Sequence, residues 1–346
     1  MSAIAELLTA AGLTGRGGGD FPTGAKVELA ERHDAELIVN ACDGEPGAAK
    51  DGWVITHHLP EVLDGARRLT RRRIRVAAHR GSRTLATLRA AGVDTVSVPR
   101  RYVSSEESAL TRLAHGGPAR PVMRYRPVTA GSRTKQGRPL PPTLVLNAET
   151  VWRAQQIIER GPAWFRSFGT AREPGPRLVT LVDGVAAPGT YPVEAGMPVR
   201  EILGLAGGCT GSARALWISG LSGGFLRAED AETATWSRVG LRPYGIRPGA
   251  GTVSVLAAGS DPWVRVRAAL TYAAGESAGQ CGPCMFGVPA VRDDLEQLAS
   301  PEPEGANERL RRHLSQLTGR GACHFPDGIA GLLTSALEVF GPPTLP

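Results

Sequence analysis

The chain has 346 residues, with 40 Lys plus Arg against 33 Asp plus Glu, and its formal net charge is +7. The length allows two or three domains, and the charged fraction of 21% is ordinary for a globular protein. No apolar run reaches the ~18 residues that span a bilayer, and the N-terminus lacks the regions of a signal peptide. We therefore expect a cytoplasmic protein with no direct membrane insertion.

Arginine carries almost all of the positive charge. The runs 67–73 and 309–313 are rich in arginine but contain few aromatic residues and belong to no recognisable nucleic-acid module. We expect no nucleic-acid partner. Each run is interpreted as a solvated face or, alternatively, as a dock for an acidic electron-transfer partner.

The first notable stretch is glycine-rich. Residues 15–26 read GRGGGDFPTGAK, which places five glycines within ten residues. Glycine allows successive backbone N–H groups to face one concavity and a flat or anionic ligand to approach closely. A second glycine-bearing loop, 40–51, follows the apolar run Leu37–Val39. Lys26 and Lys50, two of only three lysines in the chain, end the two loops.

Up to about residue 168, apolar strand patterns alternate with helical ones. We predict strands at 36–39, 74–78 and 94–98, and helices at 60–69, 82–91 and 151–160. This alternation predicts an α/β fold with helices on the faces of the sheet. Ser and Glu residues in 102–110 predict a further helix start, because a helix N-terminus favours both.

The second half has two different patterns. Residues 177–184 and 189–193 predict a hairpin, followed by a helix at 197–206 and a strand at 215–220, which together suggest a small β-grasp module. Helices at 263–274, 289–299, 307–317 and 327–340 predict a four-helix bundle. We therefore divide the chain into an α/β domain at 1–170, a β-grasp domain at 171–250 and a helical bundle at 251–346.

The two glycine-bearing loops resemble those of the NADH-oxidising flavin subunit of respiratory complex I. This family also includes the flavin subunits of NAD-linked hydrogenases and formate dehydrogenases. Its loops read GRGGAGFPTGxK and NADExEPG followed by KD, and this chain departs from them at Asp20, Cys42 and Asp43. The family's YxxGEETAL resembles 102–110, and its NNVET resembles 146–150. The resemblance covers nearly the whole chain and implies a Rossmann-like FMN domain, a β-grasp domain of the soluble-ligand-binding (SLBB-like) type and a cluster-bearing bundle.

The resemblance also implies roles for individual residues. Glu107 matches a glutamate at the family's nicotinamide pocket and is the expected catalytic residue. The residues expected to bind the cofactor are Gly15, Arg16, Gly17, Gly18, Phe21, Lys26, Asn40, Asp43, Glu45, Tyr102, Glu106, Asn147 and Thr150. Asp20 adds a carboxylate near the expected phosphates, and pairing with Arg16 would neutralise it.

Cysteines raise a metal question in the last quarter of the chain. The family holds a 4Fe–4S cluster with ESCGxCxPC and one later cysteine. Here the matching positions are Cys281, Cys284 and Cys323, while Ala278 replaces the first cysteine. Four outcomes stay open: a cubane completed by Ser277, His324 or solvent, a three-iron cluster, no cluster, or zinc.

The resemblance implies an NADH dehydrogenase-like oxidoreductase, an FMN flavoprotein that passes electrons from NADH to an iron–sulfur cluster or a protein acceptor. The alternatives are a cofactor-poor scaffold subunit of a redox complex and an FMN protein supplied by ferredoxin instead of NADH. The expected partner is a ferredoxin-like or thioredoxin-like 2Fe–2S subunit, and membrane association would come through other subunits.

Overall fold

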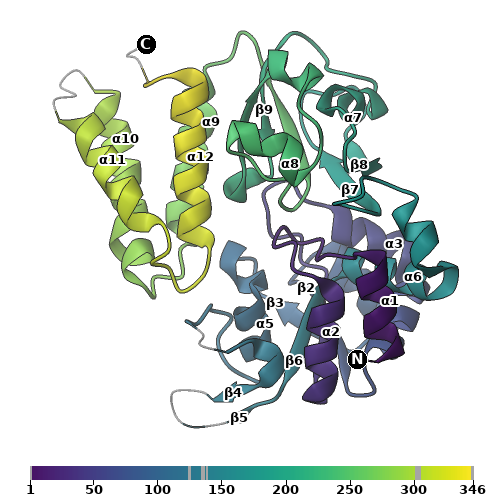
Figure 1. Cartoon of the computed structure of the whole chain (residues 1–346). Coiled ribbons are helices and arrows are strands. Elements are labelled where there is room, and N and C mark those ends of the chain that lie inside the picture. Colours follow the sequence, from purple (N-terminus) through teal and green to yellow (C-terminus); the bar gives the residue numbers. More distant parts are fainter. Residues whose placement is uncertain (1, 124–125, 134–136, 138, 301–304, 344–346) are drawn as a thin grey trace. The chain divides into compact units, whose positions relative to one another are not determined.

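The computed structural model describes residues 2–123, 126–133, 137, 139–300 and 305–343 (Figure 1). By its internal contacts the chain forms two compact units. The first contains residues 1–180 and 190–197, and the second contains 181–189 and 198–346. The three-domain division stays a prediction.

The first unit is built around a four-stranded parallel sheet of order β3-β2-β1-β6. Its helices and strands are α1 (Ala3–Ala11), α2 (Thr23–Arg32), β1 (Glu36–Asn40), α3 (Lys50–Leu69), β2 (Ile74–His79), α4 (Arg83–Ala90), β3 (Thr95–Val98), α5 (Glu107–Ala114), β4 (Ser132–Arg133), β5 (Pro139–Leu140), β6 (Thr143–Asn147), α6 (Ala148–Arg166), β7 (Pro176–Leu181, whose last residue is assigned to the second unit) and β8 (Gly189–Glu194, whose first residue is assigned to the second unit). The short 3₁₀ segments η1 (Tyr102–Ser105) and η2 (Val128–Ala130) complete it. This parallel sheet confirms the predicted Rossmann-like α/β class.

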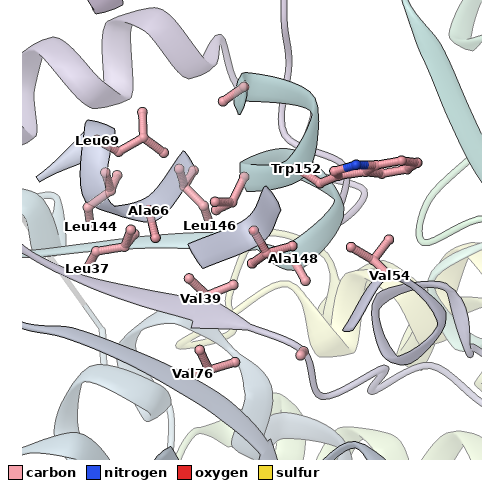
Figure 2. Close-up of a cluster of buried hydrophobic side chains, with 14 of the residues drawn as sticks. Leu37, Val39, Val54, Ala66, Leu69, Val76, Leu144, Leu146, Ala148 and Trp152 are labelled. Atoms are coloured by element: carbon pink, nitrogen blue, oxygen red, sulfur yellow. The ribbon is translucent and has the colours of Figure 1, made fainter. Parts of the chain in front are cut away.

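The sheet forms because short apolar runs end in polar or turn residues. Leu37 and Val39 of β1, Val76 of β2 and Leu144 of β6 contribute to the core shown in Figure 2. Helices α3 and α6 pack against each other and add Val54, Ala66 and Trp152 to this core. Parallel strands buried in this way are typical of sheets covered by helices.

Helix α3 is longer than the sequence indicates, since the predicted helix began only at Pro60. It starts at Lys50 and has a break at His58, whose φ of −136° and ψ of 26° are not helical. Proline at the second position after this break explains both the break and the earlier prediction, because proline disfavours a helical interior and favours a first turn.

The second unit combines antiparallel strands with helices. Its elements are α7 (Val199–Leu205), β9 (Ala213–Ile218), η3 (Gly220–Ser222), β10 (Gly224–Arg227), η4 (Ala228–Glu232), α8 (Arg238–Leu241), η5 (Arg242–Tyr244), β11 (Thr252–Ala257), α9 (Pro262–Glu276), η6 (Pro283–Gly287), α10 (Val288–Leu298), α11 (Ala306–Leu317) and α12 (Phe325–Phe340). Strand β9 pairs with β10 and β11. Helices α9 to α12 lie side by side (Figure 1). Among the described residues, none of the helices is both long and apolar enough to cross a membrane.

Candidate functional site

The glycine-rich loop lies between α1 and α2 and is closed at its base by backbone hydrogen bonds. The N–H of Gly15 donates to the carbonyl of Phe21 over 2.9 Å, and the N–H of Thr23 donates to that of Leu13 over 2.8 Å. The loop therefore has a defined shape although it consists largely of glycine.

Glycine is required where this loop meets the end of β6. A Cβ on Gly17 would lie 2.2 Å from Oδ1 of Asn147, whereas a Cβ on Gly19 would meet nothing within 4 Å. Gly18 adopts a φ of +94°, which side chains disfavour. The backbone at Gly17 thus touches Asn147, while Gly19 faces open space.

Arg16 holds the loop to α6 and to the segment before β7. Its backbone N–H donates to Oγ1 of Thr150 over 2.9 Å, and its guanidinium donates to the carbonyls of Pro174 and Pro176. Burial, together with the nearby positive charge of Arg177, lowers the pKa of Arg16 to about 9. Its guanidinium is thus engaged with backbone carbonyls of the protein itself.

Asp20 has a different partner from the one suggested by the sequence. Its carboxylate is buried and pairs with Arg177, with 3.4 Å between Oδ1 and Nη1, instead of with Arg16. Arg177 also pairs with Glu173 over 3.2 Å. Asp20 adopts a φ of +47°, a conformation that the family's glycine would adopt at lower cost. The added negative charge is therefore neutralised within the first unit.

Lys26 and the predicted catalytic residue Glu107 lie together. Nζ of Lys26 is 2.5 Å from Oε1 of Glu107 and donates to the carbonyl of Val145 over 2.9 Å. Phe21, expected to stack on a dinucleotide, has 58% of its surface exposed. The loop thus places an ammonium–carboxylate pair and an accessible aromatic face in the predicted cofactor region.

The second loop, 40–47, is held to the segment after β3. Nδ2 of Asn40 donates to the carbonyl of Ser105 over 3.1 Å, and the hydroxyl of Tyr102 donates to Glu45. A Cβ on Gly44 would lie 2.5 Å from Oγ of Ser105, which stands where the family has glycine. Three predicted cofactor residues, Asn40, Glu45 and Tyr102, are thus brought together.

Two predicted cofactor-binding carboxylates cap helices instead of standing free. Asp43 accepts hydrogen bonds from the N–H groups of Asp51 and Gly52, at 2.9 and 2.7 Å. Burial and the negative charge of Asp51 raise the pKa of Asp43 to about 7. Glu106 accepts from the N–H groups of Ser108 and Ala109 at the start of α5. Both side chains therefore stabilise helix N-termini.

Sequence reasoning missed a buried ionic network that joins the start of α3 to the end of β6 and the start of α6. Nζ of Lys50 lies 2.7 Å from Asp51 and 3.1 Å from Glu149. Asp51 also accepts from Nδ2 of Asn147 and from the N–H of Glu149, at 3.2 and 2.9 Å. Burial lowers the pKa of Lys50, but Asp51 and Glu149 outweigh it and raise the pKa above its ordinary value. The scarcity of lysine pointed to Lys50, whereas nothing local marked Glu149 as its partner.

The three predicted metal-ligating cysteines lie in the second unit. Cys284 is buried, and Cys281 and Cys323 are partly exposed. Burial raises the pKa of Cys284 to about 11. Both proposed substitute ligands have a hydrogen-bond partner, although the His324 side chain is fully exposed. Ser277 donates to the carbonyl of Cys284 over 3.0 Å, and Nδ1 of His324 lies 2.9 Å from Oδ2 of Asp327.

The residues fit FMN better than they fit a four-cysteine cluster. For FMN, the loop carries no side chains at Gly17 and Gly19: a Cβ on Gly17 would collide with Asn147, and the space beside Gly19 is open for 4 Å. For the cluster, Ala278 cannot bind iron, and no group of three or more His, Cys, Asp or Glu among the described residues is arranged to hold a metal ion. The thiol set for a cubane is therefore incomplete.

Two family models match the chain in the order seen in the structure. The Nuo51 FMN-binding domain matches residues 8–156, and the NADH-ubiquinone oxidoreductase-F iron-sulfur binding region matches residues 265–344. The first match contains the two glycine-bearing loops at 15–26 and 40–51, which we call the flavin-type loops, and the second contains the three cysteines.

Curated relatives and solved structures agree with these matches. The chain is 28% identical to the F subunit of the NADH-quinone oxidoreductase of Streptomyces coelicolor, covering 95% of this chain and 79% of the relative. It is 30% identical to the HoxS alpha subunit of the NAD-reducing hydrogenase of Cupriavidus necator, covering 82% of this chain and 50% of the relative.

A crystal structure of an NAD+-reducing [NiFe]-hydrogenase aligns with a TM-score of 0.83 and 27% identity, covering 97% of this chain and 61% of that one. The alignment thus extends through both units of the fold. Over both units, the chain is therefore similar to NADH-quinone oxidoreductase F subunits and to the corresponding subunit of an NAD-reducing hydrogenase.

Proposed function

We propose that this chain oxidises NADH at a bound FMN and passes the electrons to a protein acceptor. The observation that carries the proposal is the meeting of the glycine loop with Asn147, next to the loop 40–47, inside the region that matches an FMN-binding domain. Bound FMN accepts a hydride and releases electrons singly, which is chemistry that the side chains alone do not supply.

The residues of this chain have separate parts in the proposal. Gly17, Gly18 and Asn147 provide a close backbone surface for the flavin, while Lys26 offers a positive charge held in place by Glu107. Phe21 offers its exposed face to the dinucleotide. Glu107 is proposed to touch the nicotinamide. The buried ionic network holds the start of α3 against the end of β6 and the start of α6.

The partners proposed are subunits of a larger redox assembly, because the relatives are named as subunits of multi-subunit enzymes. A 2Fe–2S subunit of ferredoxin-like or thioredoxin-like type is the finer expectation. We derive no electron-transfer step through an iron–sulfur cluster in this chain, because the cysteine set is incomplete.

The absorption spectrum of the purified protein tests the proposal. We expect flavin bands near about 370 and 450 nm that bleach on anaerobic addition of NADH. A protein that stays colourless after reconstitution with FMN would contradict the proposal and favour a cofactor-poor scaffold. A flavin that bleaches with reduced ferredoxin but not with NADH would favour the other alternative.

A further inference from the structure

We propose that the side of the sheet where the carboxyl ends of β2 and β3 lie is a docking surface for the acidic face of an electron-transfer protein. The surface consists of Arg80, Arg83 and Arg100, which we call the edge arginines. The inference deepens the proposed function, on which it rests, by assigning where the protein acceptor binds and by what charge.

The edge arginines follow the ends of two neighbouring parallel strands. Strand β2 ends at His79 and β3 ends at Val98, and Nδ1 of His79 lies 3.0 Å from the carbonyl of Pro99. Since parallel strands end at the same edge of a sheet, the residues that follow them lie close together. All three edge arginines are exposed.

The arrangement of the edge arginines concentrates positive charge at the carboxyl ends of β2 and β3. The guanidinium of Arg100 donates to the carbonyl of Arg80 over 2.9 Å and to that of Gly81 over 3.3 Å, which draws it toward the other arginines. Within the described chain, none of the three forms an ion pair with an acidic side chain. Like charges repel when they are gathered, and an acidic partner would relieve this repulsion.

The arginine-rich run 67–73, at the opposite edge of the sheet, has a different character. Arg67 pairs with Asp64 over 2.7 Å, Arg73 pairs with Asp94 over 2.8 Å, and Arg72 pairs with Asp34. These acidic partners neutralise much of the run, so of the two interpretations offered by the sequence, a solvated face suits it. Among the residues that the structure describes, the edge arginines have no such acidic partners.

The proposed surface adjoins the flavin-type loops without occupying the glycine loop. Strand β1 lies between β2 and β6 in the sheet, and the glycine loop meets Asn147 at the end of β6. On the other side, Tyr102 follows Arg100 by two residues and bonds to Glu45 in the loop 40–47. A carrier docked there would lie beside the loop 40–47, on the side of the sheet away from β6.

A protein suits this surface better than a nucleic acid does. Residues 80–101 contain no aromatic side chain on which a base could stack. The first unit as a whole has 27 basic and 18 acidic residues, an excess that would steer an acidic carrier from a distance. Each NADH yields two electrons and one proton, and so reduces two one-electron carriers.

The test uses a plant-type 2Fe–2S ferredoxin as the acidic probe. The variant Arg80→Gln/Arg83→Gln/Arg100→Gln is compared with Arg68→Gln/Arg71→Gln/Arg89→Gln. The second variant is the control. It removes the same charge from three exposed arginines outside the docking surface: Arg68 and Arg89, in the last turns of α3 and α4, and Arg71, two residues after α3 ends. We expect the edge variant to weaken binding at low ionic strength by about tenfold or more and to flatten its salt dependence, with a much smaller effect of the control.

Binding is measured without flavin turnover, so it is independent of the proposed NADH oxidation. No binding of ferredoxin to the native protein, or equal losses in the two variants, would overturn the docking proposal. Binding of a single-stranded oligonucleotide more tightly than of ferredoxin would also overturn it. If NADH does not bleach the flavin bands of the native protein, that result would instead refute the proposed function. With benzoquinone as a neutral acceptor, the edge variant should retain its NADH oxidation rate.

Discussion

Buried charges hold the candidate site together at the scale of single residues. Lys50 lies between Asp51 and Glu149, and Asp51 in turn binds Asn147, so one ammonium joins the segments after β1 and β6. Breaking such a group leaves carboxylates buried without a counter-charge, which is more costly than losing a surface pair.

Lys50→Met should therefore lower the free energy of unfolding by about 3–5 kcal/mol. The exposed pair of Arg32 and Glu28 offers a matched control, and Arg32→Met should change stability by less than about 1 kcal/mol. Thermal and denaturant unfolding of the flavin-free proteins measure both effects. Equal losses in the two variants would show that the buried network does not stabilise the fold.

Asp43 gives the stability of the protein a specific pH dependence. Its pKa, raised from 3.8 to about 7 in the folded state, means that the folded protein binds more protons than the unfolded chain between these values. The contribution of Asp43 to stability therefore decreases as the pH rises from about 4 to 7. The free energy of unfolding of Asp43→Asn should therefore lack this decrease. The comparison is the difference in the free energy of unfolding between pH 5 and pH 8, measured for the variant and for the native protein. A parallel pH profile in both proteins would contradict the assignment.

At the scale of elements, the sequence predicted the central strands well. Strands β1, β2 and β3 were predicted within one or two residues, because each is an apolar run bounded by polar or turn residues. Helix α3 was predicted too short, since its first turn is capped by Asp43, seven residues before Lys50. Helix α6 runs to Arg166, but Gly161, with a φ of +84° and a ψ of 162°, is not helical, so the helix is interrupted where Gly-Pro was expected to end it.

The candidate site could be predicted where short sequence motifs specify its residues. It could not be predicted where it depends on contacts between residues that are distant in the sequence. The glycine loop, Asn147 and Lys26 were found from their motifs. The pairing of Asp20 with Arg177 spans 157 residues, so no local pattern could indicate it. The Ser and Glu residues of 102–110 indicated the helix start that Glu106 caps, whereas Asp43 caps α3 from seven residues before Lys50, which no local pattern indicates.

The glycine loop provides a sharp comparison between neighbouring positions. Gly17→Ala places a methyl group where Oδ1 of Asn147 lies, whereas Gly19→Ala has open space. We expect Gly17→Ala to weaken FMN binding by about tenfold or more, since a displacement of roughly 1 Å in a binding site has large effects. Gly19→Ala should bind FMN with nearly native affinity. Quenching of flavin fluorescence measures both, and equal affinities would mean that the loop does not touch the flavin at Gly17.

The loop after α9 allows a test by gain of a ligand. Ala278→Cys restores the cysteine that the family has at this position, which would complete a four-thiolate set with Cys281, Cys284 and Cys323. After anaerobic reconstitution, the variant should hold about four irons per chain, and the native protein fewer. Iron and acid-labile sulfide analysis measure this. Fewer than about four irons in the variant would show that a cysteine at position 278 does not complete a cubane.

At the scale of the whole molecule, neither compact unit is one continuous segment. The chain passes between the units after residues 180, 189 and 197. Leu178 belongs to the core of the first unit, and its N–H donates to Glu149 over 2.8 Å. The first unit is thus incomplete if the chain is cut at a predicted domain boundary near residue 170.

A fragment of residues 1–198 should therefore be more stable than a fragment of residues 1–170. The shorter fragment loses Leu178, the carbonyls that hold Arg16, and the partner of Asp20, and each loss exposes or unpairs a buried group. Denaturant unfolding of both fragments, followed by circular dichroism, measures the difference. Equal midpoints would show that residues 171–198 are not part of the first unit.

The repeated passage between units also has a consequence for synthesis on the ribosome. All segments of the first unit have been made once residue 197 emerges, whereas the three cysteines of the second unit follow more than 80 residues later. A nascent chain can therefore form its flavin-type loops, and take up a flavin, before any thiol of the 281–323 region exists. Cofactor loading would then follow the order of translation, with the flavin first.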